Sequence, residues 1–177
     1  LAFAMVLRPP LAPEDADVAW LVAALGVIGG VEATTGRALS ASWPDNIVDT
    51  ETGEVVAVTK VESQLGPGEV RAAVVIVRLD MDRLALGADR RDEVLEAVVR
   101  ATDQPAAELA DGPETAAAAY DRRCIQLGRR VKLRLLPKGE TRGTVKRIDR
   151  GGRLQIESAT GMVERISVDM LRELQMV

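Results

Sequence analysis

The sequence contains no histidine, one cysteine and four aromatic residues, and these shortages exclude whole classes of function. Without histidine there is no Ser-His-Asp or Cys-His catalysis, no histidine-bound zinc or haem, and no histidine-based pH switch. The lone Cys124 excludes internal disulfides, cysteine-bound zinc and iron–sulfur clusters. Any catalysis must therefore use carboxylates, Lys or Arg, hydroxyl groups or the backbone, and we predict no protein-held metal site.

Long apolar runs are also missing. No uninterrupted run approaches the roughly 20 residues of a membrane-spanning helix. There is no secretory signal with a charged start, an apolar centre and a small-residue cleavage site. We therefore expect a cytoplasmic protein without a membrane span. The chain starts at Leu1 instead of methionine, and Leu1–Leu7 has the composition of a buried strand, so we expect either that the natural chain is processed or that an upstream segment precedes Leu1.

The residues that are present suffice for a packed core, because 47% of the 177 residues are hydrophobic and 28% are charged. Charge is unevenly placed. Residues 1–120 contain 9 Lys and Arg against 20 Asp and Glu, a net charge of −11, whereas residues 121–177 contain 14 against 7, a net charge of +7. This asymmetry predicts two units with different surfaces. The basic unit has either a solvated surface or a docking surface for an anionic partner; nucleic acid is disfavoured because aromatics for base stacking are scarce.

The first unit shows the patterns of an α+β domain. Two runs rich in β-branched residues, separated by Gly66-Pro67-Gly68, predict an antiparallel hairpin in a central sheet. Apolar residues at helical spacing predict helices that cover this sheet. The expected strands are 1–7, 55–61 and 70–79, and the expected helices are 13–36, 89–101 and 113 to about 127.

After Gly128 the pattern changes to short strands at roughly ten-residue spacing, separated by glycine-containing turns. We expect these strands at 131–136, 143–148, 153–156 and 163–166. The predicted fold is therefore α+β, with a mixed or antiparallel sheet covered by helices over 1–127 and a small all-β barrel over 128–177.

Four stretches carry a resemblance to a known family. The Ala4–Pro9 stretch reads as a strand ending in Leu-Arg-Pro, and Trp43-Pro44-Asp45-Asn46 is similar to a Lys-Trp-Pro-Asn-Asp signature. Gly53–Glu62 and Tyr120–Val131 follow in the same order and spacing. Together they resemble the biotin–protein ligases of the biotin/lipoate ligase superfamily. This resemblance implies a class II synthetase-like catalytic core over 1–127, its N-terminal part missing, and a C-terminal module over 128–177.

The activity that the resemblance implies has two steps. Biotin and ATP form biotinyl-adenylate, which a lysine of a biotin carboxyl carrier protein then attacks. The implied cofactors are ATP, biotin and Mg²⁺, and the implied partner is that carrier protein. Such chemistry needs cations and backbone donors at the phosphates, a magnesium ion and a pocket closed to water.

Several functional positions depart from the family pattern. The two family lysines fall on Ser42 and Val55, and a glycine beside the ligand falls on Val58. The family's Gly-x-Gly strand is matched only by residues 74–77, and its Gly-Arg-Gly-Arg loop would lie upstream of Leu1. These departures predict weak or lost activity.

The departures have physical costs. Losing one preorganised donor of this kind typically costs about 2.7–4 kcal/mol of barrier. Valine in place of a pocket glycine fills space that a bicyclic ligand needs. Lys60 lies five residues beyond Val55, an odd offset, so we predict its side chain on the opposite face of the strand, where it does not restore the charge.

The site residues follow from the resemblance, each with a plainer alternative. The predicted nucleotide contacts are Trp43, Pro44, Asp45, Asn46, Arg129 and Arg130, and the predicted ligand pocket is Val55, Val58, Val75 and Val77. Alternatively, Trp43 is a core aromatic, Asp45 and Asn46 form a turn, and the two arginines are solvated. Cys124 is expected to be a buried small hydrophobe.

Three functions remain open. The chain is a biotin–protein ligase-like protein with weak or lost activity, an inactive scaffold that binds a carrier domain or other subunit, or a lipoate/octanoyl-type ligase. The lost lysines favour a degenerate site, and the basic module ranks the lipoate type last. An exposed sheet also makes a homodimer possible.

Overall fold

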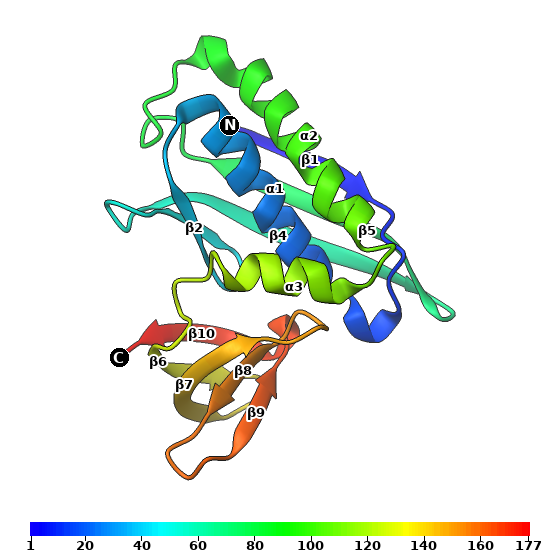
Figure 1. The fold of residues 1–177 in the computed structure, drawn as a ribbon, viewed down its shortest axis with the longest axis vertical. Coiled ribbons are helices and arrows are strands. Elements are labelled where there is room, and N and C mark those ends of the chain that lie inside the picture. The colour runs from blue at the N-terminus through cyan, green and yellow to red at the C-terminus, as the bar shows by residue number, and fades with distance from the viewer.

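The computed structural model describes residues 1–177 and contains two five-stranded antiparallel sheets and three α-helices (Figure 1). The first sheet has the strand order β1-β5-β4-β3-β2. Its strands are β1 (Ala2–Leu7), β2 (Leu39–Ser42), β3 (Asn46–Asp49), β4 (Val55–Gly66) and β5 (Glu69–Leu79). The predicted α+β class and the β4–β5 hairpin are both confirmed.

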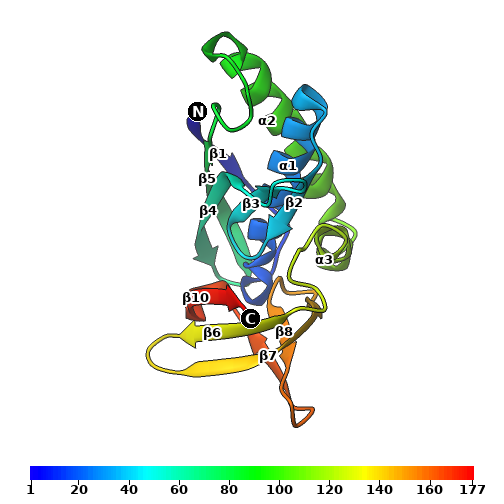
Figure 2. The same ribbon diagram turned by 90° about the vertical axis from the view of Figure 1, so that its left-hand side faces the viewer.

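Helices cover only one face of this sheet. They are α1 (Val18–Thr35), α2 (Arg91–Glu108) and α3 (Pro113–Asp121), and all three lie on the same side in Figure 2. The strands alternate accordingly: Val61 and Val75 are buried towards the helices, whereas Val58 and Ile76 are exposed on the other side. The sheet therefore has a helix-covered face and an open face.

Helix α1 is the centre of the first core. By length and composition it could cross a membrane, but 61% of it is buried inside the protein, where it packs between the sheet and α2. Its glycines allow this packing, because a Cβ at Gly30 would lie 2.5 Å from the backbone of Val98. The helix ends at Gly36, whose φ of 70° is the left-handed conformation of a C-cap.

Three helix ends differ from the sequence prediction. Helix α1 begins at Val18, after a separate 3₁₀ turn over Pro13–Asp15, instead of at residue 13. Helix α2 continues to Glu108, with Pro105 inside it, and α3 ends at Asp121. The early end of α3 has a tertiary cause. Ala41 of β2 donates to the carbonyl of Arg123 (2.8 Å) and accepts from the N–H of Ile125 (2.9 Å), which draws the chain into extended pairing.

The second sheet has the order β10-β6-β7-β8-β9 and forms the C-terminal module. Its strands are β6 (Arg130–Leu135), β7 (Glu140–Ile148), β8 (Leu154–Glu157), β9 (Val163–Ile166) and β10 (Leu171–Met176). Strand β10 was not predicted, because its mixture of charged and apolar residues lacks a clear alternation. The inner side chains of this sheet, such as Leu133 and Ile156, join the hydrophobic core of the first unit.

Candidate functional site

A row of side chains crosses the open face of the first sheet. The strand register pairs Ser42 with Asn46, Asn46 with Val58, Val58 with Arg78, and Arg78 with Ala2. Directly paired residues point to the same face, so these five share it. Three of them are positions that the resemblance singled out, and Arg78 adds a cation that sequence analysis did not assign. The register of the β4–β5 hairpin was the signal that could have found Arg78.

Lys60 lies on this same open face, next to Val58 along β4, and forms an ion pair with Glu62 (2.6 Å). The prediction that Lys60 and Val55 leave opposite faces is wrong. The β3–β4 pairing shifts register near Val55, so Val56 and Ala57 are both buried and Val55 turns outward, 40% exposed. This irregularity in the strand breaks the parity on which the prediction depended.

The predicted ligand pocket is divided between the two faces. Val55 and Val58 lie on the open side, whereas Val75 and Val77 are fully buried against the helices. Strand alternation instead turns Val74 and Ile76 to the open face. The assignment of Val75 and Val77 to a pocket with Val55 and Val58 is therefore corrected.

A cavity of about 670 Å³ opens at the Val58–Arg78 end of this face. The loop after β5, which contains Asp80, Met81, Asp82 and Arg83, forms one wall, and Arg91 at the start of α2 contributes to the lining. Arg83 is engaged: it pairs with Asp80 (3.2 Å) and Glu54 (3.7 Å). Arg78 and Arg91 have no carboxylate partner within ion-pair distance, so this cavity has free positive charge.

Trp43 is part of the core. Its side chain is 1% exposed, and its indole N–H donates to the carbonyl of Gly152 (3.2 Å) in the C-terminal module. The fully buried amide of Gln126 accepts from the Trp43 backbone N–H (3.0 Å) and donates to Ser42 Oγ (2.9 Å). Ser42, at one lysine position of the family, is thus committed to a structural hydrogen bond.

Pro44 is buried beside Trp43, and the two residues after it make local contacts. The Asn46 side chain donates to Asp45 Oδ1 (2.9 Å), and the Asp45 carbonyl accepts from the Thr59 N–H (2.8 Å). Burial raises the pKa of the Asp45 carboxyl. No group of three or more Cys, Asp or Glu side chains assembles as a metal-binding cluster.

The remaining predicted residues lie elsewhere. Arg129 and Arg130 are exposed at the start of the second sheet, where they line a separate hollow with Met176. Cys124 is buried as expected, and burial raises the pKa of its thiol to about 11, so it remains a neutral thiol. The structure therefore does not gather the six predicted nucleotide contacts into one site.

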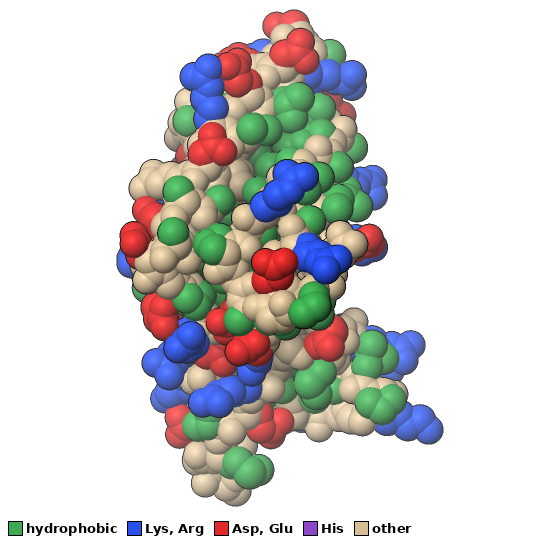
Figure 3. Space-filling view, turned by 90° about the vertical axis from the view of Figure 1, so that its right-hand side faces the viewer, with side chains coloured by type: hydrophobic (Ala, Val, Ile, Leu, Met, Phe, Trp, Pro, Cys, Tyr) green, Lys and Arg blue, Asp and Glu red, His purple; other side chains and the backbone are tan.

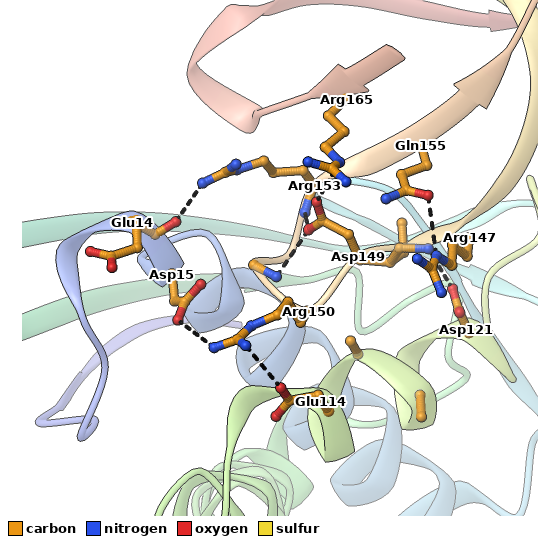
Figure 4. Close-up of a pocket in the computed structure, with 14 residues that line it drawn as sticks. Glu14, Asp15, Glu114, Asp121, Arg147, Asp149, Arg150, Arg153, Gln155 and Arg165 are labelled. Carbon is orange, nitrogen blue, oxygen red and sulfur yellow. Dashed lines mark hydrogen bonds and ion pairs between the residues drawn. The ribbon is translucent and has the colours of Figure 1, made fainter. Parts of the chain in front are cut away.

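A second cavity, of about 720 Å³, lies where the C-terminal module meets the helical layer (Figure 4). Four arginines from the module line it: Arg147, Arg150, Arg153 and Arg165. Arg150 reaches across to Glu114 (3.4 Å) and Asp15 (3.8 Å), and Arg153 donates to the carbonyl of Glu14 (2.7 Å). Five carboxylates balance these arginines, so basic and acidic side chains mingle on this surface (Figure 3). We therefore interpret this cleft as a charged seam between the units.

Two carboxylates also accept backbone hydrogen bonds across the seam. Asp17 accepts from the N–H of Val168 (3.0 Å), and Asp121 accepts from the N–H of Ile148 (2.8 Å). Burial raises the pKa of both carboxyls above the ordinary value of 3.8, although these backbone donors oppose the change. Gly152, with a φ of 83°, lies so close to α1 that a Cβ would meet the Asp17 carbonyl carbon at 2.6 Å.

Comparison with known proteins identifies the fold. Residues 127–169 match the family described as "Biotin protein ligase C terminal domain". The biotin protein ligase of Aquifex aeolicus in complex with biotin and ATP superposes with a TM-score of 0.74 at 19% identity, covering 100% of this chain and 78% of that one. A biotin protein ligase-like protein of unknown function from Silicibacter gives 0.73 at 14% identity, covering 96% and 79%. No curated protein matches the sequence.

At these identities the likeness establishes the fold and leaves the activity open. The biotin protein ligase of Leishmania major in complex with biotinyl-5-AMP also superposes, with a TM-score of 0.51 at 14% identity, covering 94% of this chain and 89% of that one. The chain therefore has a biotin protein ligase-like fold, and the resemblance found in the sequence is confirmed.

Proposed function

We propose that this chain is a biotin protein ligase-like protein that binds a ligand or partner on the open sheet face but forms biotinyl-adenylate weakly or not at all. The family reaction joins biotin and ATP and then transfers biotin to a lysine of a biotin carboxyl carrier protein. The Aquifex relative binds biotin and ATP on the same fold. In this chain the two lysine positions of the family are replaced by Ser42 and Val55, so we expect binding to be retained and adenylate formation to be weak or lost.

The observation that carries this proposal is the state of Ser42 and Val55. Ser42 accepts a hydrogen bond from the fully buried Gln126, and Val55 offers only an aliphatic side chain to the cavity. Each lost cation removes stabilisation of the charge that builds up during adenylation, a factor of roughly 10² to 10³ in rate per preorganised donor. Val58, whose position is glycine in the family, also narrows the space for a bicyclic ligand.

The direct test is ATP–pyrophosphate exchange in the presence of biotin, together with titration calorimetry of biotin and ATP. The Aquifex biotin protein ligase is the positive control under the same conditions. We expect no exchange above background and no heat from micromolar biotin. Biotin-dependent exchange at a rate near that of the control would overturn the proposal.

A gain-of-function variant tests the cause. Val55→Lys combined with Val58→Gly restores one cation and one small residue at the family positions, so exchange should rise above the wild-type level. Val6→Lys adds the same charge to the same face, but at the Val74 end of the sheet, and should have no effect. Equal rates in all three proteins would show that the loss extends beyond these two positions.

A scaffold that binds a carrier domain is the second candidate. The open face presents uncovered apolar side chains in cross-strand contact, including Val74 and Ile76, beside Val6 of β1. Calorimetry with a biotin carboxyl carrier domain distinguishes this function, because binding should occur without ATP. A lipoate or octanoyl ligase is the third candidate, and exchange that depends on lipoate or octanoate would identify it.

A further inference from the structure

We infer that Gln126 is a positioning residue whose side-chain amide couples the open sheet face to the C-terminal module. Gln126 lies in the segment that leads from α3 into β6, and its side chain is fully buried. The inference rests on the proposed function in one respect, because the open face is where that function places the ligand or partner. Hydrogen bonds through Ser42, Trp43 and Gly152 form the link.

The amide of Gln126 uses its full hydrogen-bonding capacity. Its Oε1 accepts from the backbone N–H of Trp43 (3.0 Å) and from the thiol of Cys124 (3.1 Å). Its Nε2 donates to Ser42 Oγ (2.9 Å) and to the carbonyl of Trp43 (3.2 Å). A primary amide has two donors and two acceptor sites, so none is left over. Because the Trp43 N–H only donates and its carbonyl only accepts, these contacts fix the orientation of the amide.

Trp43 extends the link to the C-terminal module. Its indole N–H donates to the carbonyl of Gly152 (3.2 Å), in the turn between β7 and β8, and its side chain is 1% exposed. Gly152 in turn lies against the backbone of Asp17, where a Cβ would have no room. Since the indole is closely packed, a movement of the Trp43 backbone must also displace the Gly152 turn.

Ser42 extends the link to the open face. It is half-buried in β2 and pairs with Asn46 of β3, in the row of side chains that crosses this face. If residue 42 cannot accept a hydrogen bond, one buried N–H of Gln126 loses its partner. The amide then gains by turning towards another acceptor, which disturbs the Trp43 peptide that it holds on both sides. The link therefore requires a hydrogen-bond acceptor at position 42.

The first experiment changes Ser42 and follows the Gly152 amide in ¹H–¹⁵N NMR spectra of the full chain. Ser42→Ala removes the acceptor, whereas Ser42→Thr keeps it. Ser40→Ala is the matched control, because Ser40 lies two residues away in the same strand but shares a hydrogen bond with Thr50 Oγ1 (3.0 Å) instead of Gln126. The indole resonance of Trp43 reports on the bond to Gly152 in the same spectra.

We expect Ser42→Ala to shift the Gly152 amide and the Trp43 indole resonances. It should also raise the equilibrium constant of unfolding about tenfold, as for one buried donor left unpaired. Ser42→Thr and Ser40→Ala should leave the Gly152 resonance in place. An unchanged Gly152 resonance in Ser42→Ala would overturn the inference, and so would an equal shift in Ser40→Ala or in Ser42→Thr.

The second experiment tests whether the link passes through the amide itself. Gln126→Met keeps the length of the side chain and removes its hydrogen bonds. In this background Ser42→Ala should change the equilibrium constant of unfolding by less than about twofold, because the two residues no longer interact. A tenfold change in both backgrounds would overturn the inference. If Gln126→Met does not fold, the three serine variants decide the question alone.

Neither experiment uses a ligand or pyrophosphate exchange. Failure of the inference is measured in the spectra and unfolding curves of the free chain, whereas failure of the proposed function is measured by biotin-dependent exchange. The two failures are therefore distinguishable.

Discussion

The open face of the first sheet and the seam to the C-terminal module differ in how their polar side chains are hydrogen-bonded and exposed. At the seam, Asp17 and Asp121 accept hydrogen bonds from backbone N–H groups of the C-terminal module, and the buried Trp43 indole donates to the carbonyl of Gly152. On the open face, Val58, Ile76 and Arg78 are exposed, and Lys60 and Glu62 form an ion pair between two exposed side chains. Contacts at the seam therefore stabilise the fold, whereas side chains on the open face can be substituted at little cost in stability.

This contrast explains how family-like residues and departures coexist in one chain. The Trp43 signature persists because Trp43 fills the core and contacts the module through Gly152. Val55, at one lysine position of the resemblance, is exposed on the open face, where substitution costs little stability. A residue of the family signature can therefore be required for packing alone. The following predictions compare the stability contributions of the seam and of the open face.

The largest effect should come from Trp43→Ala. Removing a fully buried indole leaves a cavity and an unpaired Gly152 carbonyl, so the free energy of unfolding should fall by about 4 kcal/mol. Urea denaturation followed by circular dichroism measures it. Val58→Ala, on the open face, should change the free energy of unfolding by less than about 0.5 kcal/mol. Similar losses from the two variants would remove the distinction between seam and open face.

Gly152→Ala should be next in size. An alanine at this position would have to keep the left-handed φ of Gly152, and its Cβ would overlap the backbone at Asp17. Together these effects should lower the free energy of unfolding by about 3 kcal/mol. Gly161→Ala is the control, because Gly161 has a φ of 79° but open space around it, so only about 1 kcal/mol is expected. Thermal unfolding compares the two; equal shifts in melting temperature would mean that close approach at Gly152 contributes nothing.

A pair of neighbours on β5 compares the two faces of the sheet directly. Val75→Thr places an unpartnered hydroxyl in the core and should cost about 2 kcal/mol. Val74→Thr places the same hydroxyl in solvent and should be neutral within about 0.5 kcal/mol. Chemical denaturation of both variants measures the difference, and a larger loss at Val74 would show that the open face is covered in solution.

The smallest effect concerns Asp121. Asp121→Ala leaves the Ile148 N–H without its acceptor and should cost about 1 kcal/mol, whereas Asp121→Asn keeps an acceptor oxygen and should be nearly neutral. Because burial raises the pKa of Asp121 in the folded state, the folded protein holds this proton more tightly than the unfolded chain. The contribution of Asp121 to stability is therefore present below pH 3.8 and is lost as the pH rises through the folded-state pKa.

Denaturation curves from pH 3 to 7 test this sign. The free energy of unfolding of the wild type, relative to Asp121→Asn, should decline across that interval. A wild type that gains stability relative to Asp121→Asn as the pH rises would contradict burial as the dominant cause.

Much of the fold was predictable from local patterns. The β4–β5 hairpin follows from two β-branched runs around Gly66–Gly68, and the end of α1 follows from Gly36. The end of α3 and strand β10 were not predictable in the same way. The chain leaves α3 because Ala41, some 80 residues earlier, supplies hydrogen bonds to Arg123 and Ile125, and such a contact leaves no local signal.

The candidate site was predictable only in part. Motif order located Val55 and Val58, but face assignment by parity failed for Lys60, because a register shift beside Val55 turned the strand. The motif match also misplaced Val75 and Val77, which the structure places in the core, whereas strand alternation turns Val74 and Ile76 to the open face. Arg78 was overlooked because no motif contains it, and it gains meaning only from its pairing with Val58.

The sequence by itself excluded histidine-dependent and disulfide chemistry, because composition is a property of the chain. Periodicity in the same way predicted most strands and helices, and motif order predicted the likeness to biotin protein ligases. Only the tertiary structure decided which residues share a face, which arginines lack a carboxylate partner, and that Trp43 serves the core. These properties depend on register and on contacts between distant segments, in which a shift of one residue exchanges the two sides of a strand.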